Sequence, residues 1–299
     1  MQITSLLNVF LGLLLAPLLL GFINKTKASF AGRTGPPLLQ AYYDIIKQLQ
    51  KGAVYSRTTS WIFRAGPVVG LSAVMVALTI VPLGGIAAPL AFSGDLLLLA
   101  YILGTMRFFT VIAALDTGSS FEGMGASREV LYSALAEPAF LVGLAAIARE
   151  TGILSLSQML PAVRFFSPEV VLVAVALLVV FLCENARIPF DDPETHLELT
   201  MIHEVMVLDH SGPDFALILY GSALKLWVLG SVIVGLVFPS DANSSWLVNV
   251  FIAVCGLVLL SIVVGIVESS MARLRLLRIP QLLVAAGSLS AFAFILVLR

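Results

Sequence analysis

The sequence predicts an all-α, polytopic integral membrane protein with about eight transmembrane helices and one amphipathic cytoplasmic helix. The composition supports this class, because 59% of the residues are hydrophobic and only 12% are charged. Mean hydropathy is +1.03 over 299 residues, which excludes an ordinary soluble domain. The formal charge of −1 excludes the strongly basic surface that binds nucleic acid. We expect residues 1–299 to form a single membrane domain.

Apolar segments set the expected spans, since a helix needs about 20 apolar residues to cross the hydrocarbon core. The fifth is the shortest, because Pro189 prevents its continuation. A tight re-entrant turn is expected at 123–127. The expected spans are 3–23, 66–91, 95–115, 129–148, 169–187, 214–238, 246–268 and 280–298.

Basic residues predict the orientation of these spans. They gather between spans one and two, from Lys25 to Arg64, and between spans seven and eight, at Arg273, Arg275 and Arg278. This side is expected to be cytoplasmic, with both termini on the opposite side. In a bacterium this means the inner membrane, with periplasmic termini.

The segment 36–52 has a helical pattern of a different kind. Its apolar residues recur at i, i+4, i+7, i+8 and i+11 from Leu38 to Leu49, and polar residues occupy the rest. This pattern predicts an amphipathic helix on the cytoplasmic face. Two roles remain open, a plain surface anchor or a helix that packs against a partner subunit.

The most polar stretch of the chain is the acidic segment 184–212, which begins next to Cys183. Ten of the thirty residues from Cys183 to Gly212 are Asp, Glu or His. Charge of this density is costly beside lipid, so we expect a buried proton-handling surface, a docking surface, or both. Asp192 and Pro193 are expected to begin a helix. His196, His203 and His210 would then share one face, as a possible proton relay or as part of a polar helix against a partner.

Three charged residues fall inside predicted spans. Arg107 and Glu137 lie roughly 13 Å and 12 Å from the cytoplasmic ends of spans three and four, at 1.5 Å per residue. Lys225 lies near the middle of span six. Each costs about 2.5–3.5 kcal/mol at the helix centre, so each should have a charged or polar partner. These charges either exchange protons or only lock the helix packing.

Two further features bear on proton handling. Pro138 frees a backbone carbonyl near Glu137, which favours internal water there. At the foot of span five, Glu184, Arg187 and Asp191 are expected to form one polar cluster.

The chain carries no recognisable catalytic signature. It has no P-loop, no dinucleotide fingerprint and no HExxH sequence. Cys183 and Cys255 stand alone in apolar runs. We expect no catalytic, cofactor-binding or metal-ligating residue in this chain.

Two motifs together resemble one family. Residues 184–191, ENARIPFD, resemble the ENxRxPFD signature of subunit 1 of NADH–quinone oxidoreductase, respiratory complex I. Residues 33–40, RTGPPLLQ, resemble the element that precedes the amphipathic helix in that family. The segments 192–200, 208–212 and 115–129 are more similar to the homologous anchor subunit of membrane-bound nickel–iron hydrogenases and formate hydrogenlyases. The stretch after PFD departs from the form usual in complex I, which disfavours quinone binding.

The resemblance implies a non-redox membrane anchor and coupling subunit that links electron transfer to proton or sodium translocation. Its implied partners are cytoplasmic hydrogenase large and small subunits, antiporter-like membrane subunits and the lipid bilayer. The nickel–iron site and the iron–sulfur clusters would lie in the partners. The candidate proton-path residues are Arg107, Glu129, Glu137, Glu184, Arg187, Asp191, Asp192, Glu194, Glu198, Glu204 and Lys225.

Three other functions remain open. The first is the corresponding membrane subunit of a quinone-reducing, complex I-type dehydrogenase. The second is a stand-alone ion transporter, although no inverted repeat is visible. The third is a purely structural subunit whose charges form only salt bridges.

Overall fold

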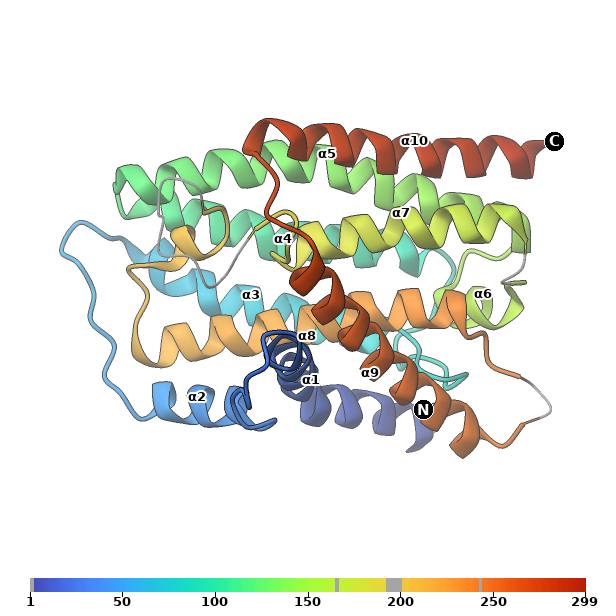
Figure 1. The fold of residues 1–299 in the computed structure, drawn as a ribbon, viewed down its shortest axis with the longest axis horizontal. Helices are drawn as coiled ribbons and strands as arrows, with labels where there is room; N and C mark the ends of the chain where they lie inside the picture. The colour runs from blue at the N-terminus through green and yellow to red at the C-terminus, as the bar shows by residue number, and fades with distance from the viewer. Residues whose placement is uncertain (1–2, 165–166, 192–200, 242–243) are drawn as a thin grey trace.

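The structure is a computed structural model that describes residues 3–164, 167–191, 201–241 and 244–299. Its helices form one bundle, and no strand occurs among the described residues (Figure 1). The α-helices are α1 (Ile3–Phe30), α2 (Gln40–Leu49), α3 (Trp61–Ile80), α4 (Asp95–Asp116), α5 (Ser120–Thr151), α6 (Leu156–Ala162), α7 (Pro168–Glu184), α8 (Gly212–Val237), α9 (Trp246–Ser270) and α10 (Ile279–Leu298). Two short 3₁₀ helices are η1 (Glu204–Val207) and η2 (Leu276–Arg278).

Seven described helices are long and apolar enough to cross a membrane. They are α1, α3, α4, α5, α8, α9 and the stretch Leu276–Leu298 that contains α10. The remaining expected span, the fifth, is α7, which has only 17 residues and packs between α5, α8 and α10. The all-α polytopic fold predicted from hydropathy is therefore confirmed.

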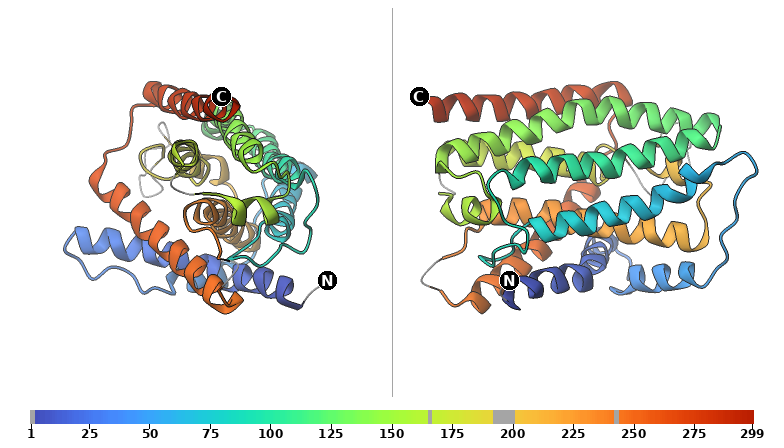
Figure 2. Two further views of the ribbon diagram at one scale, coloured as in Figure 1. Left: turned by 90° about the vertical axis from the view of Figure 1, so that its right-hand side faces the viewer. Right: turned by 180° about the vertical axis from the view of Figure 1, so that it is seen from behind.

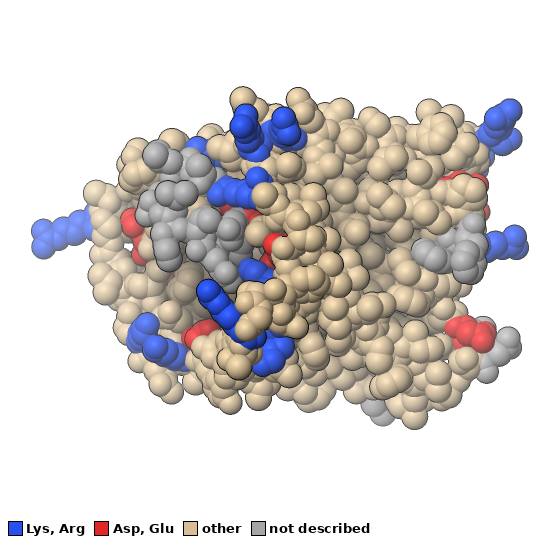
Figure 3. All heavy atoms as spheres, viewed as in Figure 1, with Lys and Arg blue, Asp and Glu red and all other residues tan. Residues whose placement is uncertain are grey.

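Helix α8 lies at the centre of the bundle. It contacts α1, α2, α3, α7 and α9, and its Trp227 side chain is fully buried (Figure 2). We call the end with α2, the α4–α5 turn and residues 201–211 the loop end, and α6 lies at the opposite end (Figure 1). Charged side chains gather toward the two ends of the visible face, with a broad uncharged band between them, as a membrane-spanning bundle requires (Figure 3).

The amphipathic helix is present as α2, and none of its residues is buried. It packs against α1 and α8 at the loop end. Helix α1 bends in Figure 1, and Pro17 explains the bend because it cannot donate to the carbonyl of Leu13. The hydroxyl of Tyr220, on α8, donates instead to Leu13 O at 2.8 Å. The hydroxyl of Tyr42, on α2, donates to the next carbonyl, Leu14 O.

Two sequence predictions about boundaries are wrong. The second span is predicted at 66–91, but α3 ends at Ile80, because Pro82 and a turn at Gly84 and Gly85 follow, both glycines with positive φ. The turn predicted at 123–127 does not exist, because α5 begins at Ser120 and runs through these residues. The glycines there serve close packing, since a Cβ on Gly125 would lie 2.3 Å from Val205 Cγ1.

The helix predicted to begin at Pro193 does not continue through the described residues after it. Residues 201–211 form a loop that contains only the four-residue η1. His203 and His210 therefore do not share a helical face. Tertiary contacts with α5 and α3 hold this segment and override its helical spacing. His196 lies outside the described residues.

Candidate functional site: a buried charged network

Arg107, in the middle of α4, holds three carboxylates from two other helices. Its guanidinium pairs with Glu137 and Glu129 on α5 and with Glu184 at the end of α7. The Nε atom of Arg107 lies 3.2 Å from Oε1 of Glu129. A guanidinium suits this task because its five N–H donors spread in a plane and stay charged. The prediction that Arg107 and Glu137 each have a charged partner is confirmed, because they pair with each other.

Lys225 supplies a second cation from α8. Its Nζ lies 3.6 Å from Oε2 of Glu184, so this carboxylate lies between Arg107 and Lys225. Glu184 and Glu129 are both buried. Four helices, α4, α5, α7 and α8, thus contribute to one cluster of opposite charges, which confirms that Lys225 also has a partner.

His203 connects this cluster to the loop end. Its Nε2 lies 3.0 Å from Oε2 of Glu129, and its Nδ1 lies 3.8 Å from Oδ2 of Asp191. The carboxylate of Asp191, whose side chain is only 2% exposed, also accepts from the backbone N–H groups of Ile202 and His203, both at 3.0 Å. Arg273 pairs with the other oxygen of Asp191 at 2.9 Å. We call the set Arg107, Glu129, Glu137, Glu184, Asp191, His203, Lys225 and Arg273 the charged network.

The electrostatics of this loop favour a charged imidazole at His203. Burial opposes protonation, but Glu129 and Asp191 outweigh it and raise the pKa of His203 to about 9. Burial would raise the pKa of Asp191, yet the bonds and charge of His203 lower it overall. The loop therefore places an imidazolium between two carboxylates near neutral pH.

The loop 201–211 lies along the first turns of α5. Arg128 donates to the carbonyl of Met201 at 2.9 Å, and Glu122 accepts from the backbone N–H of Asp209 at 3.1 Å. Between them, Gly125 allows the loop to approach, because its ideal Cβ would be 2.9 Å from Ile202 O. The position of His203 is thus fixed by several contacts on the same helix.

His210 occupies a separate, mostly apolar site. Its ring stacks on Phe63 of α3, with centroids 3.9 Å apart and an interplanar angle of 7°. Burial lowers the pKa of His210 to about 4, so its imidazole is neutral near pH 7. The structure therefore separates two histidines that the sequence placed in one relay.

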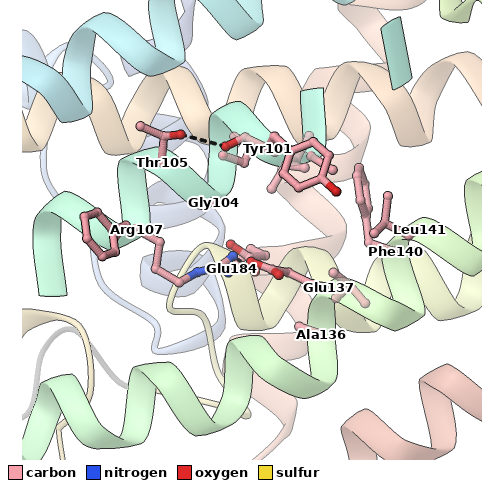
Figure 4. Close-up of a pocket in the computed structure, with 14 residues that line it drawn as sticks. Tyr101, Gly104, Thr105, Arg107, Ala136, Glu137, Phe140, Leu141 and Glu184 are labelled. Atoms are coloured by element: carbon pink, nitrogen blue, oxygen red, sulfur yellow. Dashed lines mark hydrogen bonds and ion pairs between the residues drawn. The ribbon is translucent and has the colours of Figure 1, made fainter. Parts of the chain in front are cut away.

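A cavity of about 280 Å³ opens beside the charged network, between α4 and α5. Figure 4 shows Arg107, Glu137 and Glu184 directed toward one another at its polar side, with Tyr101, Phe140 and Leu141 around the rest. Gly104 also lines it, and a Cβ there would lie 3.6 Å from Oε1 of Glu137. The cavity connects the most exposed carboxylate of the network, Glu137, to the side of the bundle.

The expectation that Glu184, Arg187 and Asp191 form one cluster is wrong for Arg187. Arg187 approaches Glu268 on α9 at 3.4 Å, and Lys27 on α1 approaches the same carboxylate at 3.3 Å. Glu268 has a fully buried side chain. The backbone turns after α7, so Arg187 points to α1 and α9 while Glu184 and Asp191 join the charged network. This second ion cluster ties three parts of the loop end together.

Not every candidate residue can be placed. Asp192, Glu194, His196 and Glu198 lie outside the described residues, and Glu204 begins η1 beside His203. Sequence reasoning missed Arg273 as a member of the charged network, Glu268 as the partner of Arg187, and Glu122 as the acceptor for the loop. The close succession of opposite charges at 268–273 is the signal in the sequence that indicates these ion pairs. Among the described residues, no group of three or more His, Cys, Asp or Glu side chains could hold a metal ion.

Comparison with known proteins places the chain in a family. The family model described as NADH dehydrogenase matches residues 2–298. Formate hydrogenlyase subunit 4 of Escherichia coli (strain K12) is 34% identical, over 94% of this chain and 93% of that protein. Hydrogenase-4 component C of the same organism is 33% identical, over 98% of this chain and 95% of that protein. An NADH-quinone oxidoreductase subunit of Wolbachia pipientis wMel is 25% identical, over 78% of this chain and 75% of that protein.

A solved structure supports the fold. A chain of the membrane-bound sulfane sulfur reductase, an archaeal respiratory membrane complex, superposes with a TM-score of 0.84. The match covers 98% of each chain at 19% identity. The resemblance seen in the ENARIPFD motif thus extends over the whole chain, which belongs to the NADH dehydrogenase family of membrane subunits, the subunit 1 type of respiratory complex I.

Proposed function

We propose that this chain is the membrane anchor and coupling subunit of an energy-conserving, membrane-bound nickel–iron hydrogenase of the formate hydrogenlyase type. The two relatives above 30% identity are named for formate hydrogenlyase and hydrogenase-4, and both align over nearly the full chain. The relative named for quinone reduction is less similar, at 25% identity over 78% of the chain. These values favour the hydrogenase assignment over the quinone-reducing alternative.

One observation carries the coupling role, the continuity of the charged network. It runs from Asp191 at the loop end through His203 and Glu129 to Arg107, and from there to Glu137 and Glu184. The acidic segment 184–212 is the docking surface that we propose for a hydrogenase arm, because it is the most polar stretch of the chain. A change at that surface therefore has a direct electrostatic route into the membrane.

In this proposal, a change in the loop moves a proton through the ion pairs of Glu129. In the described state Glu129 has two cationic neighbours, His203 and Arg107. When the redox arm draws the loop away, Glu129 loses the imidazolium and attracts Arg107 more strongly. Glu137 then loses part of its partner, and a carboxylate without a partner in a low-dielectric site takes up a proton. Return of the loop restores Arg107 to Glu137 and releases the proton.

The electron-transfer chemistry belongs to the partners in this proposal. A cytoplasmic large subunit would hold the nickel–iron site, a small subunit the iron–sulfur clusters, and antiporter-like membrane subunits would continue the ion path. This chain would provide the docking surface for the redox arm and the charged network that responds to it. Both would lie toward the cytoplasmic side of the inner membrane, and both termini would lie on the other side. The stand-alone transporter is disfavoured, because the similar proteins are named as a subunit and a component.

Translocation in vesicles tests the proposal. The assembled complex in inside-out membrane vesicles is supplied with chemically reduced viologen dye. Hydrogen evolution and proton uptake into the vesicle lumen, measured as acidification of the lumen, are recorded together. We expect Asp191→Asn and Glu137→Gln to keep hydrogen evolution and to lose most of the proton uptake. Glu150→Gln is the matched control, because Glu150 lies on the same helix as Glu137 but bonds Ser167 at the opposite end. Normal uptake in both test variants would refute the coupling role.

A further inference from the structure

The side of the bundle between α4 and α5 carries an ionisable group that faces outward at membrane depth. The side chain of Glu137 is 47% exposed, although it lies near the middle of the 32-residue α5. The other two carboxylates bound by Arg107 are almost fully covered. In Figure 2, seen from behind, α4 and α5 run side by side along the outside of the bundle. A carboxylate on such a surface would meet lipid tails unless another protein covers it.

The cation available to Glu137 within this chain is shared. Arg107 pairs with three carboxylates, those of Glu137, Glu129 and Glu184. Glu184 also pairs with Lys225, and Glu129 also pairs with His203. Glu137 is therefore the carboxylate of the three without a cation of its own among the described residues. Its free side borders the 280 Å³ cavity. This side of Glu137 is open to a hydrogen-bonding side chain that enters from the side of the bundle.

The surroundings of the cavity suit a helix rather than a soluble ion. Leu97, Tyr101 and Phe108 are spaced i, i+4 and i+11, so they share one face of α4. Tyr101 is 73% exposed and Phe108 is 59% exposed, and both line the cavity mouth. In the membrane these aromatic side chains alone would be covered by lipid, but the carboxylate among them requires contact with protein or water. An anionic lipid headgroup is excluded here by charge, since it would face a carboxylate.

We propose that the α4–α5 face is the docking site for a transmembrane helix of another subunit, and that this helix inserts a lysine or arginine side chain into the cavity to pair with Glu137. The proposal specifies one neighbour within the coupling function proposed above, and it rests on that function. The partner's basic side chain would compete with Arg107 for Glu137. The charge state of Glu137 would then affect the neighbouring subunit as well as the loop.

Photo-cross-linking in the intact complex tests the docking site. A benzophenone amino acid replaces Tyr101 or Phe108, and the adducts are identified by mass spectrometry. We expect a polypeptide adduct to a membrane subunit, with a Lys or Arg within about two helical turns of the linked residue. Adducts with lipid alone, or a linked helix without any basic residue, would overturn the proposal. This readout needs no proton pumping, so it can fail while the coupling function stands.

Charge exchange tests the role of Glu137 in the same contact. We expect Glu137→Lys to lower the Tyr101 adduct at least tenfold, and a basic-to-Glu change in the linked partner helix to restore it. Glu137→Gln, which keeps shape and removes charge, should give an intermediate yield. An unchanged yield in Glu137→Lys would overturn the pairing. If that variant does not assemble, the proposal is tested by whether the helix cross-linked in the complex with native Glu137 contains a Lys or Arg.

Discussion

Nε2 of His203 lies 3.0 Å from Oε2 of Glu129, and this contact joins a surface loop to a charge cluster inside the membrane. The loop side of the contact is held by Asp191, and the membrane side by Arg107. Each of these groups is fixed by a different element. A movement of the loop by a few ångströms would therefore break the contact without disturbing the helices.

The first prediction concerns pH. Because the pKa of His203 in the folded protein is about 9, above its ordinary value of 6.5, its imidazolium stabilises the docked loop fully below pH 6.5. This stabilisation disappears as the pH rises through about 9. We expect hydrogen–deuterium exchange of residues 201–211 in the complex, corrected for intrinsic rates, to increase over this range. His203→Gln should exchange faster at pH 6.5 and show no such increase. An identical pH profile in the variant would remove His203 from the contact.

The second prediction concerns loop docking on α5. Gly125→Ala should displace the loop, because the new Cβ would lie 2.3 Å from Val205 Cγ1 and 2.9 Å from Ile202 O. Gly123→Ala is the matched control, since nothing lies within 4 Å of its Cβ and alanine favours a helix by up to about 1 kcal/mol. We expect Gly125→Ala alone to lose proton uptake in vesicles and to expose the loop to protease. Equal behaviour of the two variants would contradict the docked geometry.

The third prediction concerns Arg107 as the shared cation. Arg107→Met removes the shared cation from the buried carboxylates of Glu129 and Glu184, and removal of one partner from a buried ion pair costs about 3–5 kcal/mol. We expect a lower melting temperature of the detergent-solubilised complex and loss of proton uptake. Arg149→Met, on the exposed surface at the other end of α5, should leave both unchanged. A normal melting temperature in Arg107→Met would contradict the role of Arg107 as the shared cation.

The fourth prediction concerns the bend in α1. Tyr220→Phe removes the donor for Leu13 O, and one hydrogen bond contributes about 0.5–1.5 kcal/mol to stability. In a Pro17→Ala background the helix can supply its own donor, so the same substitution should cost less. The four melting temperatures of this double-mutant cycle measure the coupling. Additive effects would mean that Pro17 and Tyr220 act independently.

The span positions and α2 were predictable because they depend on local patterns, the length of apolar runs and a 3.6-residue period. The charged residues inside spans were also predictable as paired, since burial of an isolated charge is too costly. The start of α5 was not predictable, because Gly123 and Gly125 resemble a turn until the loop that packs on them is known. The loop at His203 was missed for the same reason, and so was the contact of Arg187 with Glu268, 81 residues away.

Infrared difference spectroscopy of the intact complex, recorded between its oxidised and reduced states, tests the central claim most directly. The account predicts a protonated-carboxyl band that appears on reduction, is lost in Glu137→Gln, and is also lost in His203→Gln with the redox centres still reducible. A band that persists in Glu137→Gln would contradict the account because another group would then take up the proton. A band that persists in His203→Gln would contradict it because Glu137 would then take up the proton without the loop.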